Sequence, residues 1–306
     1  MCRGMIPTLR QLQYLKLLAE HRSFSRAAEA AHVTQPTLSA GVQELEKILG
    51  APVVDRGRAG VILTAAGEEA AARAEAILAQ AEDLVQAARG AGQPLAGRFR
   101  LGVIPTIAPF LLPGALPALR ARYPKLRLFL REDLTSRLIA QLKSGALDAA
   151  LVALPYDMAG LEWAEVAEDE LMAAFPANHP LTAERRVTPE RLEAEDLILL
   201  EDGHCLREHA LAACGLEPGR TKDRAGYEAA FAATSLPTLV QMVGSGLGVS
   251  FLPAMAVDAG LADAAAVAVR PLEAEHPARQ IVVAWRAGSS RATEGRLLAE
   301  VLRGAA

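Results

Sequence analysis

Apolar residues recur at helical spacing in the first fifty residues of the chain. They form three groups: Leu9, Leu12 and Leu15; Ala27, Ala28 and Ala31; and Leu38, Val42, Leu45 and Leu49. This pattern predicts three short helices. We expect Ser25 to cap the second helix and Thr34 to cap the third. Pro36 falls in the first turn of that third helix, and Gly50 should end it.

A short hairpin is predicted after the three helices. Residues 52–64, PVVDRGRAGVILT, contain two β-branched runs separated by a segment from Gly57 to Gly60. Two strands joined by a glycine-containing turn are typical of a β-hairpin. Placed after three helices, the hairpin would be the wing of a winged helix-turn-helix. We therefore assign residues 1–66 to a mainly helical DNA-binding domain.

A single long helix is predicted next, within a linker that we place at residues 67–92. The sequence GEEAAARAEAILAQAEDLVQAARG carries apolar residues at alternating spacings of four and three. The members of this seam are Ala70, Ala74, Ile77, Ala81, Leu84 and Ala88. Such a helix would be about 35 Å long and cannot bury its seam alone. We expect it to dimerise with the same helix of a second subunit. The alternative is an amphipathic helix that lies on its own domain.

The remainder of the chain, residues 93–306, alternates between strand-like and helical segments. The strand-like segments are FRLGVI, LRLFL, DAALVAL, LMAAF, DLILL, VSFLP and QIVVAW. Helical stretches such as SRLIAQLKSG, LREHALAAC and LPTLVQMVGSG separate them. This order predicts an α/β domain with parallel strand pairing. Its length is enough for two lobes, with ligands expected between them at the carboxyl ends of the strands.

Composition and charge agree with more than one folded unit. The chain has 306 residues, of which 51% are hydrophobic and 22% are charged, as in globular proteins that divide into domains. Residues 1–66 hold eight basic and five acidic side chains, a net charge of +3, so the rest carries −7 of the total −4. A small basic DNA-binding domain on an acidic sensor fits this asymmetry. No signal peptide or apolar span is visible, which predicts a cytoplasmic protein that does not engage a membrane.

The three cysteines limit the possible chemistry. Cys2, Cys205 and Cys214 are too few for a disulfide scaffold, so their role is redox, metal binding or packing. From spacing alone, small buried hydrophobes are the favoured interpretation. A zinc site that also used His204 and His209 lacks the short paired spacing of metal motifs. We expect neither a metal nor a cofactor.

The N-terminal stretch SFSRAAEAAHVTQPTLSAGVQELEKILGAPVVDRGRAGVILTAAG closely resembles the DNA-binding segment of LysR-type transcriptional regulators. The resemblance implies that the helix beginning near Gln35 enters the major groove and that the wing follows the DNA backbone. Short polar side chains at the start of that helix suit contacts with bases and phosphates. The DNA-contact candidates are Gln35, Pro36, Thr37, Ser39, Arg56 and Arg58. Alternatively, Thr37 and Ser39 merely face solvent, and Arg56 is an ordinary surface charge.

The C-terminal part is similar to the peroxide-sensing members of the same family. The segment LLEDGHCLREHALAAC carries this likeness, together with GVIPTIAPFLLP, REDLTSRLIAQLKSGALD and TSLPTLVQMVGSGLGVSFLP. It implies a two-lobed regulatory domain like that of periplasmic binding proteins, with Cys205 as the peroxidatic and Cys214 as the resolving cysteine. The residues implied around the peroxide are Thr106, Thr135, His204, Arg207 and Arg279. The segment GLEPGRTKDRAGYEAAFAA is longer than the family pattern, and Ala232 stands where an arginine is common.

The implied chemistry needs Cys205 as a thiolate. A helix N-terminus and nearby Arg207 would favour that anion. Threonine hydroxyls could orient peroxide, while Arg279 or His204 could help the departing oxygen to take a proton. The resulting sulfenic acid would condense with Cys214. On one continuous helix the two cysteines would lie roughly 13 Å apart, whereas a disulfide needs Cα atoms within about 7 Å, so oxidation would require local refolding.

The sequence thus predicts a DNA-binding, peroxide-responsive transcriptional regulator that is not a turnover enzyme. The expected partners are promoter DNA, hydrogen peroxide, further copies of the chain in a homodimer and homotetramer, and RNA polymerase. Two alternatives stay open. One is a LysR-type regulator that binds a small organic ligand between its lobes, with Thr106 as a ligand hydroxyl. The other is a thiol peroxidase with an accessory DNA-binding domain.

Overall fold

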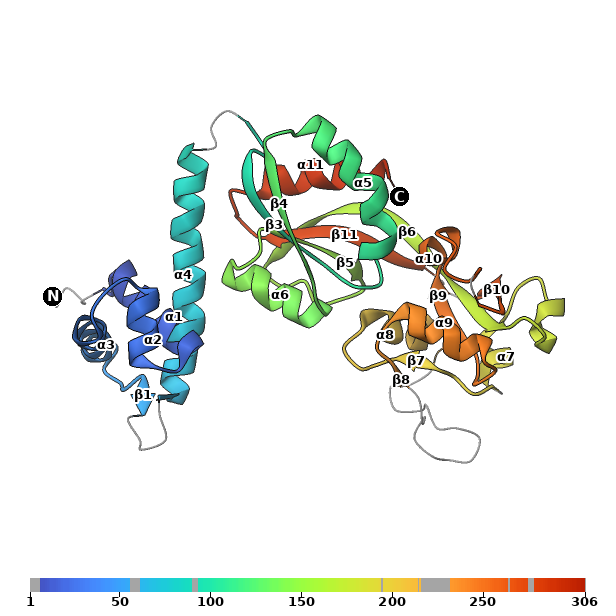
Figure 1. The fold of residues 1–306 in the computed structure, drawn as a ribbon, viewed down its shortest axis with the longest axis horizontal. Helices are drawn as coiled ribbons and strands as arrows, with labels where there is room; N and C mark the ends of the chain where they lie inside the picture. The colour runs from blue at the N-terminus through green and yellow to red at the C-terminus, as the bar shows by residue number, and fades with distance from the viewer. Residues whose placement is uncertain are drawn as a thin grey trace. The chain divides into compact units, whose positions relative to one another are not determined.

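A computed structural model describes residues 6–55, 61–89, 93–193, 195–213, 215, 232–263, 265–274 and 278–305. The chain divides near residues 91 and 92 into two compact units, which are described separately. Figure 1 shows the helical N-terminal unit and the sheet-containing C-terminal unit. None of the described helices combines the length and the apolar character that crossing a bilayer requires.

Three short helices form the N-terminal unit, as the periodicity predicts. They are α1 (Leu9–His21), α2 (Phe24–Ala30) and α3 (Gln35–Leu49). A capping box starts α1, because the side chain and backbone of Thr8 exchange hydrogen bonds with those of Gln11. The predicted apolar stripes meet in one core, in which Leu15, Leu18, Leu38, Val42 and Leu45 are fully buried.

The capping predictions are only partly correct. Gly50 ends α3 in a left-handed conformation, and Pro36 lies in the first turn. Ser23, not Ser25, caps α2, since its side chain accepts a hydrogen bond from the backbone N–H of Arg26. The Ser25 hydroxyl instead donates to the side chain of Gln35 at 3.2 Å. Thr34 occupies the cap position of α3 without making a side-chain capping bond, because its hydroxyl pairs with that of Thr37.

The predicted hairpin and long helix complete this unit. Strands β1 (Val54–Asp55) and β2 (Ile62–Leu63) pair antiparallel, and α4 spans Ala65–Arg89. The beginning of α4 packs into the core of its own unit: Ala74 is buried there and Ala70 packs beside it.

The predicted seam on α4 therefore divides along its length. Ala74 is not available to a second subunit, because the core of the helix-turn-helix already covers it. Ile77 and Leu84 are 45% and 72% exposed, Ala81 is half-buried, and the side chain of Ala88 lies outside the described residues. Only the C-terminal part of the seam is free within this unit.

A seven-stranded mixed sheet organises the C-terminal unit. Its order is β10-β6-β11-β5-β3-β4, with β9 also paired to β6. The strands are β3 (Gly97–Val103), β4 (Leu126–Glu132), β5 (Ala149–Leu154), β6 (Leu161–Pro176), β9 (Ser250–Pro253), β10 (Val267–Pro271) and β11 (Ala278–Arg286). A separate parallel pair joins β7 (Leu199–Leu200) and β8 (Ala232–Ala233). The helices are α5 (Ala108–Arg122), α6 (Thr135–Ser144), η1 (Pro180–Ala183), α7 (Pro189–Glu193), α8 (Cys205–Ala213), α9 (Leu236–Gly244), α10 (Ala254–Asp258) and α11 (Ala292–Arg303).

The expectation of parallel pairing holds for only part of this sheet. Strand β3 is parallel to β4 and β5, but β11 is antiparallel to both β5 and β6. The reason is that β6 carries the chain out of the first lobe and β11 brings it back, so these two strands must run in opposite directions. The segment LMAAF is only the end of the 16-residue β6. The first part of this strand was not predicted, because it is rich in acidic residues.

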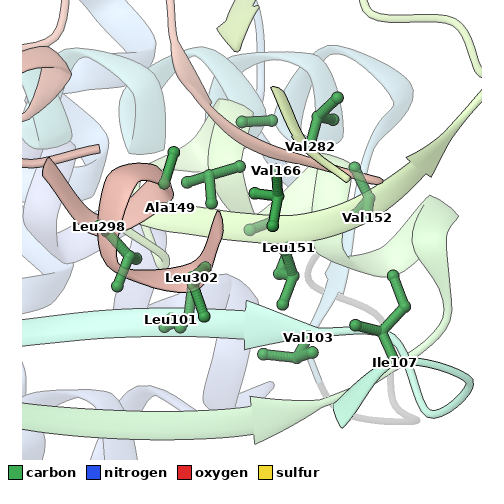
Figure 2. Packing of buried hydrophobic residues seen from close by; sticks show 14 of the residues in the cluster. Leu101, Val103, Ile107, Ala149, Leu151, Val152, Val166, Val282, Leu298 and Leu302 are labelled. Carbon is green, nitrogen blue, oxygen red and sulfur yellow. The ribbon is translucent and has the colours of Figure 1, made fainter. Parts of the chain in front are cut away.

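Two hydrophobic cores confirm the two lobes. One lies around β3, β5 and β11 with helices α5 and α11, and Figure 2 shows Leu101, Leu151 and Leu302 among its side chains. The other lies around the second half of β6 with α8 and α9. Strand β6 contributes to both cores, so it joins the lobes through covalent structure and through packing.

The packing of α11 on the first lobe gives a stability prediction. A Cβ atom added at Gly295 would clash with the ring of Trp285, whose side chain is buried. We expect Gly295→Ala to lower the free energy of unfolding by about 1–3 kcal/mol through overpacking, even though alanine favours helices. Urea denaturation checks this. Gly304→Ala is the matched control, because Gly304 ends the same helix with a φ of −75° and its Cβ would meet nothing closer than 3.6 Å. Equal stability of the two variants would contradict the prediction.

Candidate functional site

The thiol of Cys205 lies where the two lobes meet. Cys205 is the first residue of α8, as predicted, and it follows a turn at Gly203, whose φ is +94°. Its side chain is only 4% exposed and packs into the core of the first lobe. The neighbouring Leu206 and Ala210, on the same helix, pack into the core of the second lobe. One short helix therefore contributes to both cores.

A buried arginine supplies positive charge to the thiol. Arg279 on β11 is 1% exposed and lies directly across the sheet from Asp169 on β6. Its Nε and Nη2 are 2.9 Å and 2.8 Å from Asp169 Oδ2. Its Nη1 donates to Thr106 Oγ1 at 2.8 Å, and its Nη2 donates to the carbonyl of the same residue at 3.0 Å. These bonds fix the guanidinium group, which lies close enough to lower the pKa of Cys205.

Burial nevertheless dominates the state of the thiol. It raises the pKa of Cys205 above its ordinary value, and the positive charge of Arg279 only partly offsets this effect. The Thr135 hydroxyl, at the start of α6, also lies near enough to lower this pKa. Yet Thr135 Oγ1 is fully buried and makes no hydrogen bond of normal geometry within the described part of the chain. An unsatisfied hydroxyl beside a buried thiol leaves a donor and an acceptor for a small polar molecule.

Two of the predicted pocket residues have other roles in this structure. Arg207 pairs with Asp202, at 3.0 Å, and donates to the carbonyl of Leu200 at 3.2 Å. It ties α8 to the preceding turn, and its expected effect on the Cys205 anion stays a prediction; the positive charge of Arg279 does lower the pKa of Cys205. His204 donates its backbone N–H to Glu201, and burial lowers the pKa of its imidazole.

The structure adds two residues that the sequence analysis did not place in the site. His209 follows Cys205 by one helical turn and is 6% exposed, and the charge of Arg279 helps to lower its pKa. Tyr156 has a raised pKa, chiefly from burial, with contributions from the negative charges of Glu208 and Cys205. The spacing of four residues between Cys205 and His209 was the signal available in the sequence. Nothing in the sequence linked Tyr156 to the thiol.

A pocket of about 820 Å³ adjoins this cluster. It is lined by Leu154, Pro155, Tyr156, Asp157, Met158, Trp163, Leu171, His209, Ala212, Ala213, Ala278 and Gln280. The walls are largely apolar and include the C-terminal turn of α8. Thr106 and Cys205 are not among the lining residues, so the pocket lies beside the thiol and does not contain it.

Cys214, which was expected to be the resolving cysteine, lies outside the described residues, as do Cys2 and residues 216–231. Helix α8 is continuous from Cys205 to Ala213, the residue before Cys214. Eight residues of helix correspond to roughly 12 Å. Ala232 begins β8 and pairs with Leu199. The structure does not describe the side chain of Ala232. The described residues hold no group of three or more histidine, cysteine or acidic side chains suited to a metal ion.

Some of the predicted DNA-contact residues lie within the described part of the chain and some lie outside it. Gln35, Pro36 and Thr37 are exposed at the start of α3, and Ser39 is half-buried. Arg56 and Arg58 lie outside the described residues. The three exposed side chains are therefore accessible at the end of the helix where recognition was expected.

Comparisons with known proteins agree with both units. Residues 9–68 match the family "Bacterial regulatory helix-turn-helix protein, lysR family", and residues 92–306 match "LysR substrate binding domain". The HTH-type transcriptional regulator EstR of Acinetobacter baylyi is 42% identical over 253 residues, which cover 83% of this chain and 82% of EstR. A Streptomyces viridosporus protein named probable hydrogen peroxide-inducible genes activator is 38% identical over 297 residues, or 97% of this chain and 94% of that protein.

A solved structure covers nearly all of the chain. The full-length structure of an OxyR variant from Pseudomonas aeruginosa has a TM-score of 0.77 and 36% sequence identity, and the match covers 98% of this chain and 99% of that one. The similarity confirms the expected fold class, an N-terminal helix-turn-helix followed by a two-lobed regulatory domain.

The raised pKa of Cys205 predicts a distinctive pH dependence. Only the thiolate reacts with alkylating agents, so the alkylation rate of Cys205 in the folded protein should keep rising from about pH 7 to beyond about pH 9. In denaturant the rate should level off near the ordinary thiol pKa of about 8.5. Peptide-resolved mass spectrometry separates Cys205 from the other two cysteines. A plateau below about pH 8 in the folded protein would show that burial does not control this thiol.

Proposed function

Because the chain belongs to the LysR family of bacterial transcriptional regulators, we propose that it is a DNA-binding regulator that responds to hydrogen peroxide by oxidation of Cys205. The observation that carries this proposal is the site itself. The buried thiol of Cys205 lies beside the guanidinium group of Arg279 and the unsatisfied hydroxyl of Thr135. Relatives of similar length that are named for peroxide or OxyR support the same function.

The first chemical step forms a sulfenic acid. The Cys205 thiolate attacks one peroxide oxygen, the O–O bond breaks, and the departing hydroxide takes a proton to become water. Arg279 stabilises the negative charge during this step but does not supply the proton, since a guanidinium group stays protonated in proteins. This changes the role expected for Arg279 from proton donor to fixed positive charge. The buried site admits a small oxidant more readily than a bulky one.

The second step joins the sulfenic acid to the Cys214 thiol and releases a second molecule of water. Helix α8 separates the two positions by roughly 12 Å, and a disulfide needs Cα atoms within about 7 Å. Oxidation would therefore require α8 to unwind. Because Leu206 and Ala210 pack into the second lobe, unwinding would also repack that lobe, and subunit contacts would shift with it.

The N-terminal unit would carry the response to promoter DNA. The exposed start of α3 suits insertion into the major groove, and the exposed part of the α4 seam suits pairing with a second subunit. The family suggests that dimers assemble further into a tetramer and that the activator contacts RNA polymerase at the promoter. In this proposal peroxide is a signal and not a substrate to be turned over, unlike in a thiol peroxidase.

A second candidate is a regulator that responds to a small organic molecule. The largely apolar pocket of about 820 Å³ favours it, as does the similarity to EstR, whose name does not refer to peroxide. The hypothesis that the Thr106 hydroxyl binds such a ligand loses support, because Thr106 accepts a hydrogen bond from Arg279 and does not line this pocket. In this case the cysteines would have no role in the response.

Peroxide treatment distinguishes these functions. We expect one equivalent of peroxide to link Cys205 to Cys214, as mapped by mass spectrometry, and to change operator binding or promoter output. Cys205→Ser should abolish the response, and Cys214→Ser should stop at a sulfenic acid or mixed disulfide. Cys2→Ser is the control and should behave as wild type. If low doses oxidise neither cysteine, the ligand-binding regulator is the better account. Sustained peroxide consumption with a thiol reductant would favour the peroxidase.

The dimer can be tested on α4. Leu84 is 72% exposed, so Leu84→Glu should leave thermal stability unchanged while shifting the mass from light scattering toward a smaller species and weakening operator binding. Ala72→Glu is the matched control, because Ala72 is also exposed but lies outside the seam. An unchanged mass and DNA affinity for Leu84→Glu would exclude the seam from dimerisation.

A further inference from the structure

We infer that His209 positions peroxide at the Cys205 thiol, by accepting a hydrogen bond from it at Nδ1, and that this acceptor makes the peroxide reaction sensitive to acid. The inference rests on the proposed peroxide response and adds a residue and a pH dependence to it. It arises from a buried polar atom that the rest of the site leaves without a function.

The tautomer of His209 follows from one contact. Its Nε2 is 3.1 Å from the carbonyl oxygen of Pro155. A carbonyl oxygen only accepts hydrogen bonds, so Nε2 must carry the proton. In the neutral ring Nδ1 then has a free lone pair and acts as an acceptor. That Nδ1 is fully buried and makes no hydrogen bond with any of the residues that the structure describes.

The position of His209 relates this acceptor to the thiol. Residues four apart on a helix share a face, and helical side chains lean toward the N-terminus of their helix. His209 therefore lies over the turn that contains Cys205. Both side chains are buried, and both respond to the charge of Arg279. Thr135 adds a second unsatisfied buried atom, its Oγ1, next to the same thiol. A molecule with two hydroxyl groups, such as hydrogen peroxide, matches this pair.

His209 also lines the pocket from which peroxide would arrive. The pocket of about 820 Å³ is bounded by His209 and Tyr156, and the negative charge of Cys205 contributes to the raised pKa of Tyr156. The thiol therefore lies close behind this wall, although Cys205 is not among the lining residues. His209 lines the pocket and also lies over the turn that contains the thiol, so it can bind peroxide that enters through the pocket and hold it at the thiol.

The surrounding charges keep this acceptor available at neutral pH. Burial is the largest cause of the lowered pKa of His209, and the positive charge of Arg279 lowers it further, whereas the hydrogen bond to Pro155 acts in the opposite direction. Asp169, which pairs with Arg279, offsets part of that charge. Glu208, which precedes His209 on α8, raises the pKa of the thiol.

The sign of the pH effect follows from these charges. Since the pKa of His209 lies below its ordinary value, the ring is neutral at pH 7 and gains a proton only under more acidic conditions. Protonation converts Nδ1 from an acceptor to a donor and places a second positive charge near Arg279. The peroxide reaction should therefore fall in acid more steeply than the loss of thiolate alone explains.

Two reactions of the same thiol separate these effects. Sulfenic acid formation by peroxide, trapped with dimedone, needs the thiolate and the acceptor. Methyl methanethiosulfonate converts the same thiolate to a methyl disulfide and releases methanesulfinate, and this reaction needs only the thiolate. The ratio of the two Cys205 rates, measured from about pH 5 to about pH 8 around the ordinary histidine pKa, reports on the acceptor. We expect this ratio to fall in acid for wild type.

Two substitutions test whether His209 is the cause. His209→Gln keeps an acceptor but does not titrate, so the ratio should become independent of pH while staying near the neutral wild-type value. His209→Leu removes the acceptor, and the ratio should drop about tenfold at neutral pH, as expected for one lost hydrogen bond. His21→Gln, in the other unit, should keep the wild-type profile. Thermal unfolding of each variant controls for misfolding.

The possible outcomes are distinct. If wild-type Cys205 is not oxidised by peroxide at any pH, the proposed function fails, and the inference fails with it. If wild type is oxidised but the ratio is the same for wild type, His209→Gln and His209→Leu at every pH, only the inference is wrong. If the ratio falls in acid equally for wild type and His209→Gln, another group is responsible and the inference is also wrong.

Discussion

The buried pair of Arg279 and Asp169 is the interaction on which the regulatory unit depends. The two residues lie opposite each other on the strands that cross between the lobes. Arg279 also holds Thr106, after β3 in the first lobe, while Asp169 Oδ1 accepts the backbone N–H of Met255 at the start of α10. Removal of one partner of a buried ion pair typically costs about 3–5 kcal/mol, because the other charge is left uncompensated. The pair therefore fixes the crossing strands and the lobe surfaces beside them.

The same guanidinium group opposes the effect of burial on the thiol. Burial alone would hold Cys205 as an unreactive thiol, and the fixed charge of Arg279 opposes that effect. Burial still dominates, so the reactive anion is a minor species at neutral pH. A thiol in this state is protected from bulky oxidants, since it is almost inaccessible. Its reaction would depend on groups that orient a small oxidant, which is why the unsatisfied atoms of Thr135 and His209 matter.

In the proposed function, the position of Cys205 would couple its oxidation to the arrangement of the lobes. Its side chain packs in the first lobe, whereas Leu206, Ala210 and Leu211 on the same helix pack in the second. In the proposed switch, withdrawal of the sulfur from the first core would also disturb the helix that packs into the second core. Apolar cores tolerate few intermediate arrangements because they are closely packed. A change of this kind would favour two discrete states, as a transcriptional switch requires.

Local features of the chain could be predicted from the sequence. The three helices, the hairpin, the long α4 and the placement of Cys205 at the start of α8 depend on periodicity and on capping or turn residues that are close together in the chain. The family resemblance also depended on contiguous motifs, and it brought Thr106, Thr135 and Arg279 to attention.

Tertiary structure decided which of these residues act on one another. Arg279 and Asp169 are 110 residues apart, and Arg279 and Thr106 are 173 apart, so no local pattern could show that this network fixes the guanidinium group near the thiol. The antiparallel course of β6 and β11 follows from the return of the chain between the lobes. The core of the helix-turn-helix covers Ala74 and takes it out of the predicted seam. The tautomer that makes His209 Nδ1 an acceptor is fixed by a carbonyl 54 residues away. Burial and hydrogen bonding are properties of the packed chain, and only the folded arrangement determines them.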